Sequence, residues 1–251
     1  MSRQKRVKSE TGIYHVMLRG INKQQVFYDN DDYNMFLTVL SRCKTISGFR
    51  LHAYCLMRNH VHLLIQEGEE PIDLIFKRLG DAFVYWYNIK YERTGAVFQG
   101  RYKSLPVNDD AYFISVLRYI HQNPINAGIV KRCSDYTFSS YNDYFKGNGF
   151  VSTGFALELI GINEFKRIHE EICADKHLDI NDNAAMRISD NEARRIIELR
   201  TNCRSLEEYQ ALPRETQIEY AKYLRKEGLS IRQIILFTGV SQRIAEGRSA
   251  E

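Results

Sequence analysis

Two histidines separated by one residue, His60 and His62, are the first candidates for chemistry in this sequence. Side chains alternate between the two faces of a β-strand, so in a strand both imidazoles would point to one face and Val61 to the other. Two neighbouring imidazoles on one face can bind a metal ion. The His-Val-His sequence alone does not decide between a metal-binding pair and a structural pair.

A second group of candidates lies in the segment from Tyr119 to Asn123. Residues four apart share one face of a helix, so the two side chains would project together. The Asn123 side-chain oxygen could join two imidazoles around a metal ion and leave positions open for a phosphate and a water. Tyr119 would then be close enough to attack that phosphate. Tyr112 lies seven residues earlier on the same face, and spacing does not choose between the two tyrosines.

The chemistry that this combination favours is cleavage of a phosphodiester by a tyrosine. Such an attack forms a covalent phosphotyrosine and frees a hydroxyl, so bond energy is retained and strands can be rejoined. A metal ion would polarise the phosphate and stabilise the charge of the transition state. A metal-dependent hydrolase of RNA or nucleotides, with water as the nucleophile, would use the same histidines and remains an alternative hypothesis.

Alternating strands and helices would position these residues. Short-period apolar segments predict strands over residues 12–19, 49–57, 60–66 and 102–107, with Arg58-Asn59 as a tight turn. Helical spacing predicts helices over 31–45, capped by Asp31 or Asp32, over 72–92, and from an Asn108 cap to Pro124. This order indicates an α+β fold, an antiparallel sheet with packed helices.

The remainder of the chain is predicted to be mainly helical. Glycine and polar residues at 145–154 indicate the end of a first domain. Near the other end, Ser230 and Ser241 stand at helix N-cap positions, and glycine-containing turns separate short helices, which is the helix-turn-helix pattern. We therefore expect a catalytic domain over residues 1–148, a helical linker over 149–189 and a DNA-binding helical region over 190–251.

Composition is that of an ordinary globular protein, with a net charge of +4. The basic excess lies in residues 1–150, which would attract a polyanionic partner. No apolar segment is long enough to span a membrane or to serve as a secretory signal, so a cytoplasmic protein is expected. The five cysteines show no C-x-x-C spacing, which is atypical of a disulfide framework or a zinc site.

Residues 10–145 resemble a known family, the HUH single-tyrosine transposases, and within it the REP-associated tyrosine transposases of bacteria. The resemblance is carried by the order of several short motifs along the chain. These motifs are Tyr14-His15-Val16 with Arg19-Gly20, residues 57–64 (MRNHVHLL), 98–102 (FQGRY), 119–124 (YIHQNP) and 138–141 (FSSY).

The resemblance implies a ferredoxin-like sheet and a site in which Tyr119 is the nucleophile and His60, His62 and Asn123 bind a divalent metal, Mg²⁺ or Mn²⁺. It also implies single-stranded DNA near palindromic hairpins as substrate, cut through a 5′-phosphotyrosine intermediate. Whether the chain acts as a monomer or as a dimer is left open. The alternative is a non-catalytic, sequence-specific DNA-binding regulator that uses the C-terminal helices. Candidate DNA contacts are Arg3, Lys5, Arg6, Arg19, Arg101 and Lys103.

Overall fold

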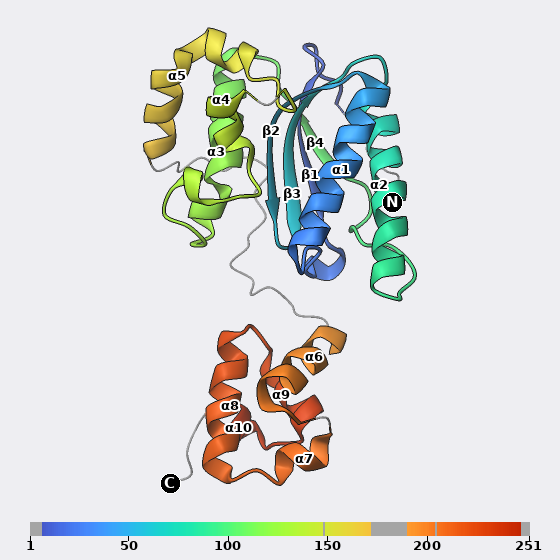
Figure 1. Cartoon of the computed structure of the whole chain (residues 1–251), viewed down its shortest axis with the longest axis vertical. Helices are drawn as coiled ribbons and strands as arrows, with labels where there is room; N and C mark the ends of the chain where they lie inside the picture. The colour runs from blue at the N-terminus through green and yellow to red at the C-terminus, as the bar shows by residue number, and fades with distance from the viewer. Residues whose placement is uncertain (1–6, 148, 172–189, 204, 247–251) are drawn as a thin grey trace. The chain divides into compact units, whose positions relative to one another are not determined.

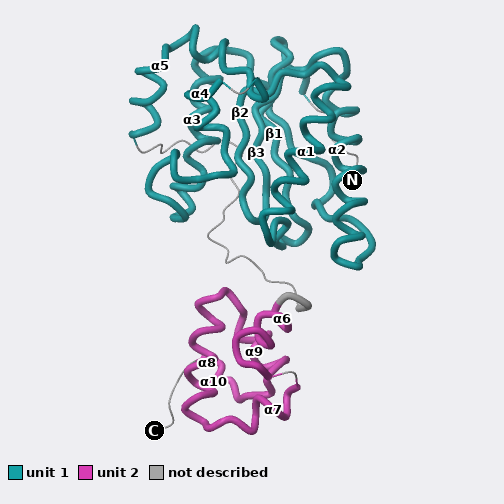
Figure 2. Tube along the Cα trace, in the orientation of Figure 1, with its two compact units in different colours: residues 1–181 teal, residues 182–251 magenta. Residues whose placement is uncertain are grey.

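The computed structural model describes residues 7–147, 149–171, 190–203 and 205–246. The chain divides into two compact units, residues 1–181 and residues 182–251, which are described separately (Figure 2). Residues 172–189, which belong to the expected linker, lie outside the described residues. The proposed division into three regions therefore stays a prediction.

A four-stranded antiparallel sheet forms the centre of the first unit. Its strand order is β2-β3-β1-β4, and the elements follow one another as β1-α1-β2-β3-α2-β4, which confirms the predicted ferredoxin-like α+β fold. The two-residue turn Arg58-Asn59 joins β2 to β3, as predicted. The bounds are β1 Ile13–Arg19, α1 Asn30–Ser47, β2 Arg50–Met57, β3 His60–Gln66, α2 Ile72–Lys90 and β4 Lys103–Pro106.

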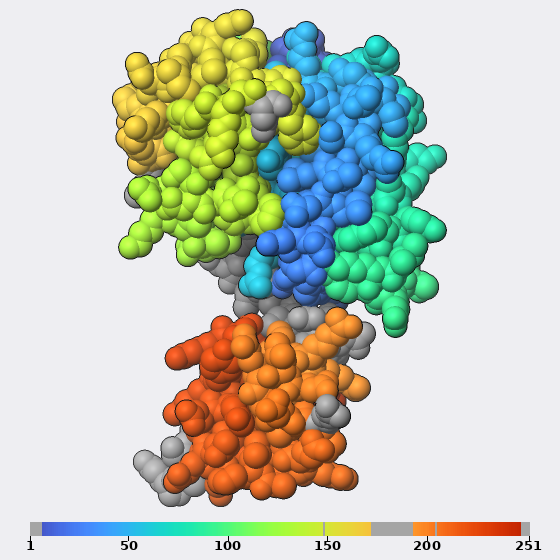
Figure 3. Space-filling model, in the orientation of Figure 1, coloured from blue at the N-terminus to red at the C-terminus, as the bar shows by residue number. Residues whose placement is uncertain are grey.

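Helices cover both faces of this sheet (Figure 1). One face lies under α1 and α2, and the other under α3, α4 and α5, with α3 packed mainly on β2 and β3. In the space-filling view the helices and loops leave little of the sheet visible (Figure 3). The remaining elements of this unit are η1 Ile21–Lys23, α3 Asp110–Asn126, η2 Cys133–Asp135, η3 Ser140–Asn142, α4 Asp143–Lys146 and α5 Gly154–Glu170.

The starts and ends of two helices differ from the prediction. Asp29, in an extended conformation, is the N-cap of α1, and Asp32 completes a capping box with it, so the predicted caps were wrong. Asp109 rather than Asn108 caps α3, because the Asn108 side chain instead accepts hydrogen bonds from the segment preceding β1. Pro124 does not end α3. It lies in the last turn, where a missing N–H removes only one helical hydrogen bond.

The second unit is helical, which confirms the predicted helical C-terminal region. It has a separate buried core, to which α6, α7, α8 and α9 contribute Ile197, Tyr209, Leu224 and Ile234. Ser230 is the N-cap of α9 through a capping box, and Ser241 is the N-cap residue of α10, as predicted. Among the described helices of the chain, none is long and apolar enough to cross a membrane. The elements are α6 Asp190–Thr201, α7 Leu206–Gln210, α8 Arg214–Lys226, α9 Ile231–Thr238 and α10 Gln242–Ala245.

Candidate active site

Strand β3 carries the histidine pair in the interior of the first unit. In the sheet, His60 lies between Arg19 of β1 and Met57 of β2, and His62 occupies the next row on the same face. Val61 points to the opposite face. The two histidines are 2% and 1% exposed, so any group that binds them is held away from bulk water.

Helix α3 places Tyr119 and Asn123 directly over this pair. Asn123 Oδ1 lies 3.3 Å from His60 Nε2, and the Tyr119 ring lies edge-on to His62 with centroids 5.5 Å apart. Tyr112 stands about 10 Å further along α3, because each helical residue rises about 1.5 Å. The structure therefore brings His60, His62, Tyr119 and Asn123 together at one end of α3, and the contacts with the histidines come from the later tyrosine.

The hydrogen bonds of His60 indicate which ring nitrogen would face a ligand. His60 Nδ1 lies 2.6 Å from Asn59 Oδ1, while the Asn59 amide nitrogen donates to the Lys23 carbonyl. Because an amide oxygen only accepts, the Nδ1 atom carries the proton. In the neutral ring, Nε2 then directs its lone pair toward Asn123 Oδ1, which is also an acceptor.

With the Asn123 oxygen turned toward the ring, the two acceptors lie 3.3 Å apart, and either a proton on Nε2 or a cation between them would make this contact favourable. Around an octahedral ion with bonds of about 2.1 Å, neighbouring ligand atoms lie about 3 Å apart, close to the observed separation. Imidazole nitrogens are common ligands of transition-metal ions, and an amide oxygen is a ligand that Mg²⁺ and Mn²⁺ accept, so this set offers donors to a divalent cation. Among the described residues, no group of three His, Cys, Asp or Glu is placed to hold a metal, so a metal at this pair would need a ligand of another kind, such as the Asn123 amide.

A third imidazole adjoins the pair. His15 of β1 is fully buried, and its Nε2 lies 3.0 Å from His62 Nδ1. Its ring also lies 5.8 Å from that of Tyr119. Spacing along the sequence does not reveal this contact, because the two histidines are 47 residues apart and meet only through β1–β3 pairing. The register of that pairing was the missing signal.

Behind α3, a buried chain of hydrogen bonds holds the helix in place. His121 Nδ1 lies 2.9 Å from His169 Nε2 of α5, and His121 Nε2 lies 2.8 Å from Ser140 Oγ. Ser140 Oγ also accepts the backbone N–H of Tyr54 in β2. His169 Nδ1 donates to the Phe165 carbonyl, so one consistent set of neutral tautomers runs along the chain.

Burial controls the charge of these two imidazoles. It lowers the pKa of His121 well below its ordinary value, with the nearby His169 adding to the effect. It lowers the pKa of His169 to about 4. Both rings are therefore neutral at pH 7, and α3 is tied to β2 and α5 without a buried charge.

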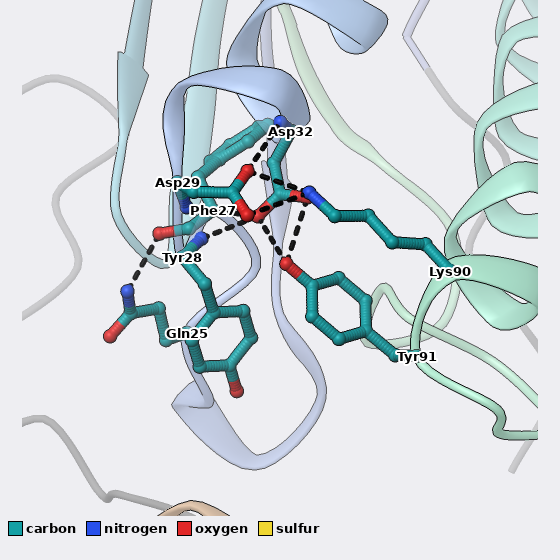
Figure 4. Close-up of polar contacts among 7 residues, drawn as sticks. All are labelled: Gln25, Phe27, Tyr28, Asp29, Asp32, Lys90 and Tyr91. Atoms are coloured by element: carbon teal, nitrogen blue, oxygen red, sulfur yellow. Dashed lines mark hydrogen bonds and ion pairs between the residues drawn. The ribbon is translucent and has the colours of Figure 1, made fainter. Parts of the chain in front are cut away.

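On the opposite side, a carboxylate cluster fixes the loop that precedes α1 (Figure 4). The buried Asp32 carboxylate accepts from the backbone N–H groups of Tyr28 and Asp29, from Lys90 Nζ and from the Tyr91 hydroxyl. Burial, together with this carboxylate, raises the pKa of Tyr91, so the hydroxyl stays a donor. The cluster thus attaches the loop firmly to the end of α2.

This loop in turn holds the turn before His60. The backbone N–H groups of Val26 and Phe27 both donate to the Arg58 carbonyl, at 2.8 and 3.0 Å. Gly20 N donates to the Asn59 carbonyl at 2.8 Å, and a Cβ at Gly20 would lie 2.2 Å from the Gln24 carbonyl oxygen. Only glycine therefore fits at this close approach, which sets the position of the histidine strand.

The structure describes three of the six candidate DNA contacts, namely Arg19, Arg101 and Lys103. Arg19 lies directly opposite His60 in the sheet. Met17 lies opposite His62 on one side and opposite Lys103 on the other. Arg19 and Lys103 therefore belong to the histidine face of the sheet. Arg101 is exposed just before β4, and Lys103 is exposed on it. Arg3, Lys5 and Arg6 lie outside the described residues.

Comparisons with known proteins agree with this fold. Residues 8–123 match the family described as "Transposase IS200 like". The REP-associated tyrosine transposase of Escherichia coli (strain K12) is 23% identical over 138 residues, which cover 54% of this chain and 79% of the relative. A relative from Haemophilus influenzae, provisionally given the same name, is 24% identical over 155 residues, covering 57% of this chain and 86% of the relative.

A solved structure of a REP-associated tyrosine transposase bound to a REP hairpin shares the fold, with a TM-score of 0.51 and 19% identity over 61% of this chain and 90% of that one. The first unit thus carries a transposase domain of the IS200-like family, and the protein is an enzyme of that class. Within that family, the relatives to which the chain is similar are REP-associated tyrosine transposases.

Proposed function

We propose that this transposase cuts and rejoins single-stranded DNA with Tyr119 as the nucleophile, and that His60, His62 and Asn123 hold a divalent cation, Mg²⁺ or Mn²⁺. The observation that carries the proposal is the geometry at the end of α3. One helical turn brings an amide oxygen to 3.3 Å from His60 Nε2 and a tyrosine ring to 5.5 Å from His62.

In the proposed reaction, the Tyr119 hydroxyl oxygen attacks the phosphorus of a DNA phosphodiester. The bond from phosphorus to the 3′ oxygen breaks, the tyrosine proton is released and the leaving 3′ oxygen takes up a proton. The product is a 5′-phosphotyrosine, itself a phosphodiester, so a later 3′ hydroxyl can reverse the step on another strand. A bound cation would supply charge stabilisation at the phosphate.

The residues around the site have supporting tasks in this proposal. The Asn59 amide oxygen keeps the His60 proton on Nδ1, so that Nε2 is the ligand atom. Burial under α3 excludes water, which favours transfer to tyrosine over hydrolysis. Arg19 and Lys103, on the same face of the sheet, would contact backbone phosphates. Because the solved relative binds a REP hairpin, we propose a hairpin-forming palindromic strand as the substrate.

Detection of a protein–DNA adduct tests the nucleophile. The protein would be incubated with labelled single-stranded hairpin DNA and Mg²⁺ or Mn²⁺ and then analysed on a denaturing gel. We expect an adduct with the unaltered protein and with Tyr112→Phe, and none with a folded Tyr119→Phe. Loss of the adduct in Tyr112→Phe alone would transfer the role to Tyr112. Cleavage that leaves no adduct and survives Tyr119→Phe would support the hydrolase alternative.

A second function is proposed for the second unit, namely binding of double-stranded DNA through a helix-turn-helix. The supporting observation is that α9 and α10 are joined by a short turn, in which Gly239 has a φ of 66° and lies close against Leu206 of α7. After this turn, Gln242 and Arg243 are exposed on α10, where a recognition helix would meet base edges.

Fluorescence anisotropy with duplex DNA tests this second function in the full-length chain. We expect the double variant Gln242→Ala, Arg243→Ala to weaken duplex binding without changing the adduct assay. If duplex affinity is unchanged, α10 is not the contacting element. If instead the chain binds DNA but never forms an adduct with any metal, the non-catalytic regulator is the better account.

A further inference from the structure

We infer that His15 is a positioning residue, which sets the tautomer and ring orientation of His62 and restrains the ring of Tyr119. The inference rests on the proposed function, because it assigns His15 a task at the same site. His15 would touch neither the cation nor the DNA.

The position of His15 follows from the pairing of β1 with β3. His15 is directly opposite Leu64 and Met17 is directly opposite His62, so His15 and His62 are diagonal neighbours on one face. Their ring centroids are 5.2 Å apart at an interplanar angle of 33°, with His15 Nε2 3.0 Å from His62 Nδ1. Both side chains are almost fully buried, so this hydrogen bond is shielded from competition with bulk water.

The two histidines of the pair have different kinds of partner at Nδ1. An imidazole that binds a cation through Nε2 must carry its proton on Nδ1, and a fixed acceptor there secures this tautomer. His60 has such an acceptor in Asn59 Oδ1. His62 has the Nε2 atom of another imidazole, which accepts only while the His15 proton is on its own Nδ1. In that tautomer, His15 would be the counterpart of Asn59.

The same ring also contacts the proposed nucleophile. The Tyr119 ring meets His62 edge-on at 5.5 Å and His15 edge-on at 5.8 Å. Edge-to-face contact with two rings from neighbouring strands restricts rotation of the tyrosine side chain. A change at His15 should thus disturb both the ligand nitrogen and the direction of the Tyr119 hydroxyl.

Binding of Mn²⁺ to the DNA-free protein, followed by electron paramagnetic resonance, tests the first part. In His15→Phe, which keeps a ring of similar size but has no acceptor, we expect the affinity to fall about 10- to 100-fold, the usual effect of losing a partner of a metal ligand. His15→Gln supplies an amide acceptor and should restore most of the affinity. The matched control is His52→Phe, since His52 is equally buried and packs on α3 near Phe113, away from the site.

Nitrogen-15 NMR of the His62 ring in the metal-free protein provides a second readout. We expect the proton on Nδ1 in the unaltered protein and in His15→Gln, and a mixture of tautomers in His15→Phe. An unchanged tautomer together with unchanged Mn²⁺ affinity in His15→Phe would overturn the inference. If His15→Phe fails to fold, a His15→Gln protein with weakened Mn²⁺ binding and mixed tautomers would overturn it as well.

Failure of the proposed function gives a different pattern. If the unaltered protein binds no Mn²⁺, or if His60→Ala does not weaken binding, the metal site itself is wrong and the role of His15 falls with it. If binding depends on His60 and Asn123 but not on His15, the metal site stands and only the positioning role is lost.

Discussion

The two faces of the central sheet contrast sharply in chemistry, although the same strands form both. Toward α1 and α2, β1 and β3 present aliphatic side chains such as Val16, Val61 and Leu63. Toward α3, the alternate positions present His15, His60 and His62. Both sets are buried, so burial alone does not distinguish a structural face from a functional one.

The difference shows how one strand can serve stability and chemistry at once. The aliphatic face contributes favourable burial, which needs no partner beyond close packing. The α3 face buries polar groups, and each has to be matched by a hydrogen bond to avoid a penalty of about 1–3 kcal/mol. Such matching fixes the side chains in defined positions, which is what a catalytic site requires.

Truncation on the aliphatic face should have the largest effect on stability. Leu63 is fully buried, so Leu63→Ala should lower the free energy of unfolding by about 2–5 kcal/mol through lost burial and a cavity. Urea denaturation measures this change. At temperatures where the variant is folded, its Mn²⁺ affinity should equal that of the unaltered protein, because Leu63 points away from the site. A parallel loss of Mn²⁺ affinity would contradict the division between the faces.

The α3 side should make stability depend on pH. Burial lowers the pKa of His52 to about 4, and the nearby cations Arg50 and Lys44 add to this effect. Burial also lowers the pKa of His169 to about 4, and there Arg118 adds to the effect. The unfolded chain binds protons at these histidines below pH 6.5, whereas the folded chain does so only near pH 4. Stability is therefore greatest above pH 6.5 and falls as the pH drops toward 4, by up to about 1.4 kcal/mol per pH unit for each histidine.

Urea denaturation between pH 7.5 and 4.5 checks this expectation, and His52→Phe should reduce the slope. Burial raises the pKa of Asp29, but its hydrogen bonds to Lys90 and to the backbone outweigh burial and lower it. The stability that Asp29 contributes is therefore lost only nearer pH 4, at lower pH than the loss due to the histidines. A slope in His52→Phe equal to that of the unaltered protein would show that this ring titrates normally in the folded chain.

The smallest effect is expected from an exposed cation at the edge of the histidine face. Lys103→Ala should weaken single-stranded DNA binding modestly and reduce the slope of log affinity against log salt by about 0.7, the value for one phosphate contact on a single strand. Fluorescence anisotropy over a salt series measures the slope. Lys77, exposed on α2 on the other side of the sheet, is the matched control, and equal slopes for both variants would remove Lys103 from the DNA path.

Much of the fold could be predicted from the sequence, because local patterns determine it. The alternation around Val61 indicated a two-faced strand, the Arg58-Asn59 turn indicated a hairpin, and the order of elements indicated the α+β architecture. Helix caps were less predictable. Several acidic residues stand near the start of α1, and only the chain path shows that Asp29 is the extended one.

The site was predictable where its residues are neighbours in sequence. His60 with His62, and Tyr119 with Asn123, were found by spacing, whereas the approach of the two pairs depends on how α3 packs over β3. The contacts of His15 with His62 and of His121 with His169 join residues 47 and 48 positions apart. No local pattern encodes such contacts, so these buried partners emerged only from the structure.

Identification of the tyrosine that becomes attached to DNA tests the central claim most directly. The unaltered protein would be incubated with a single-stranded hairpin substrate and Mn²⁺, digested with nuclease and protease, and analysed by mass spectrometry for a nucleotide-bearing peptide. The account predicts the nucleotide on Tyr119, linked through a 5′ phosphate, and none when His60 is replaced by alanine. A nucleotide on Tyr112 or on any other residue would contradict it.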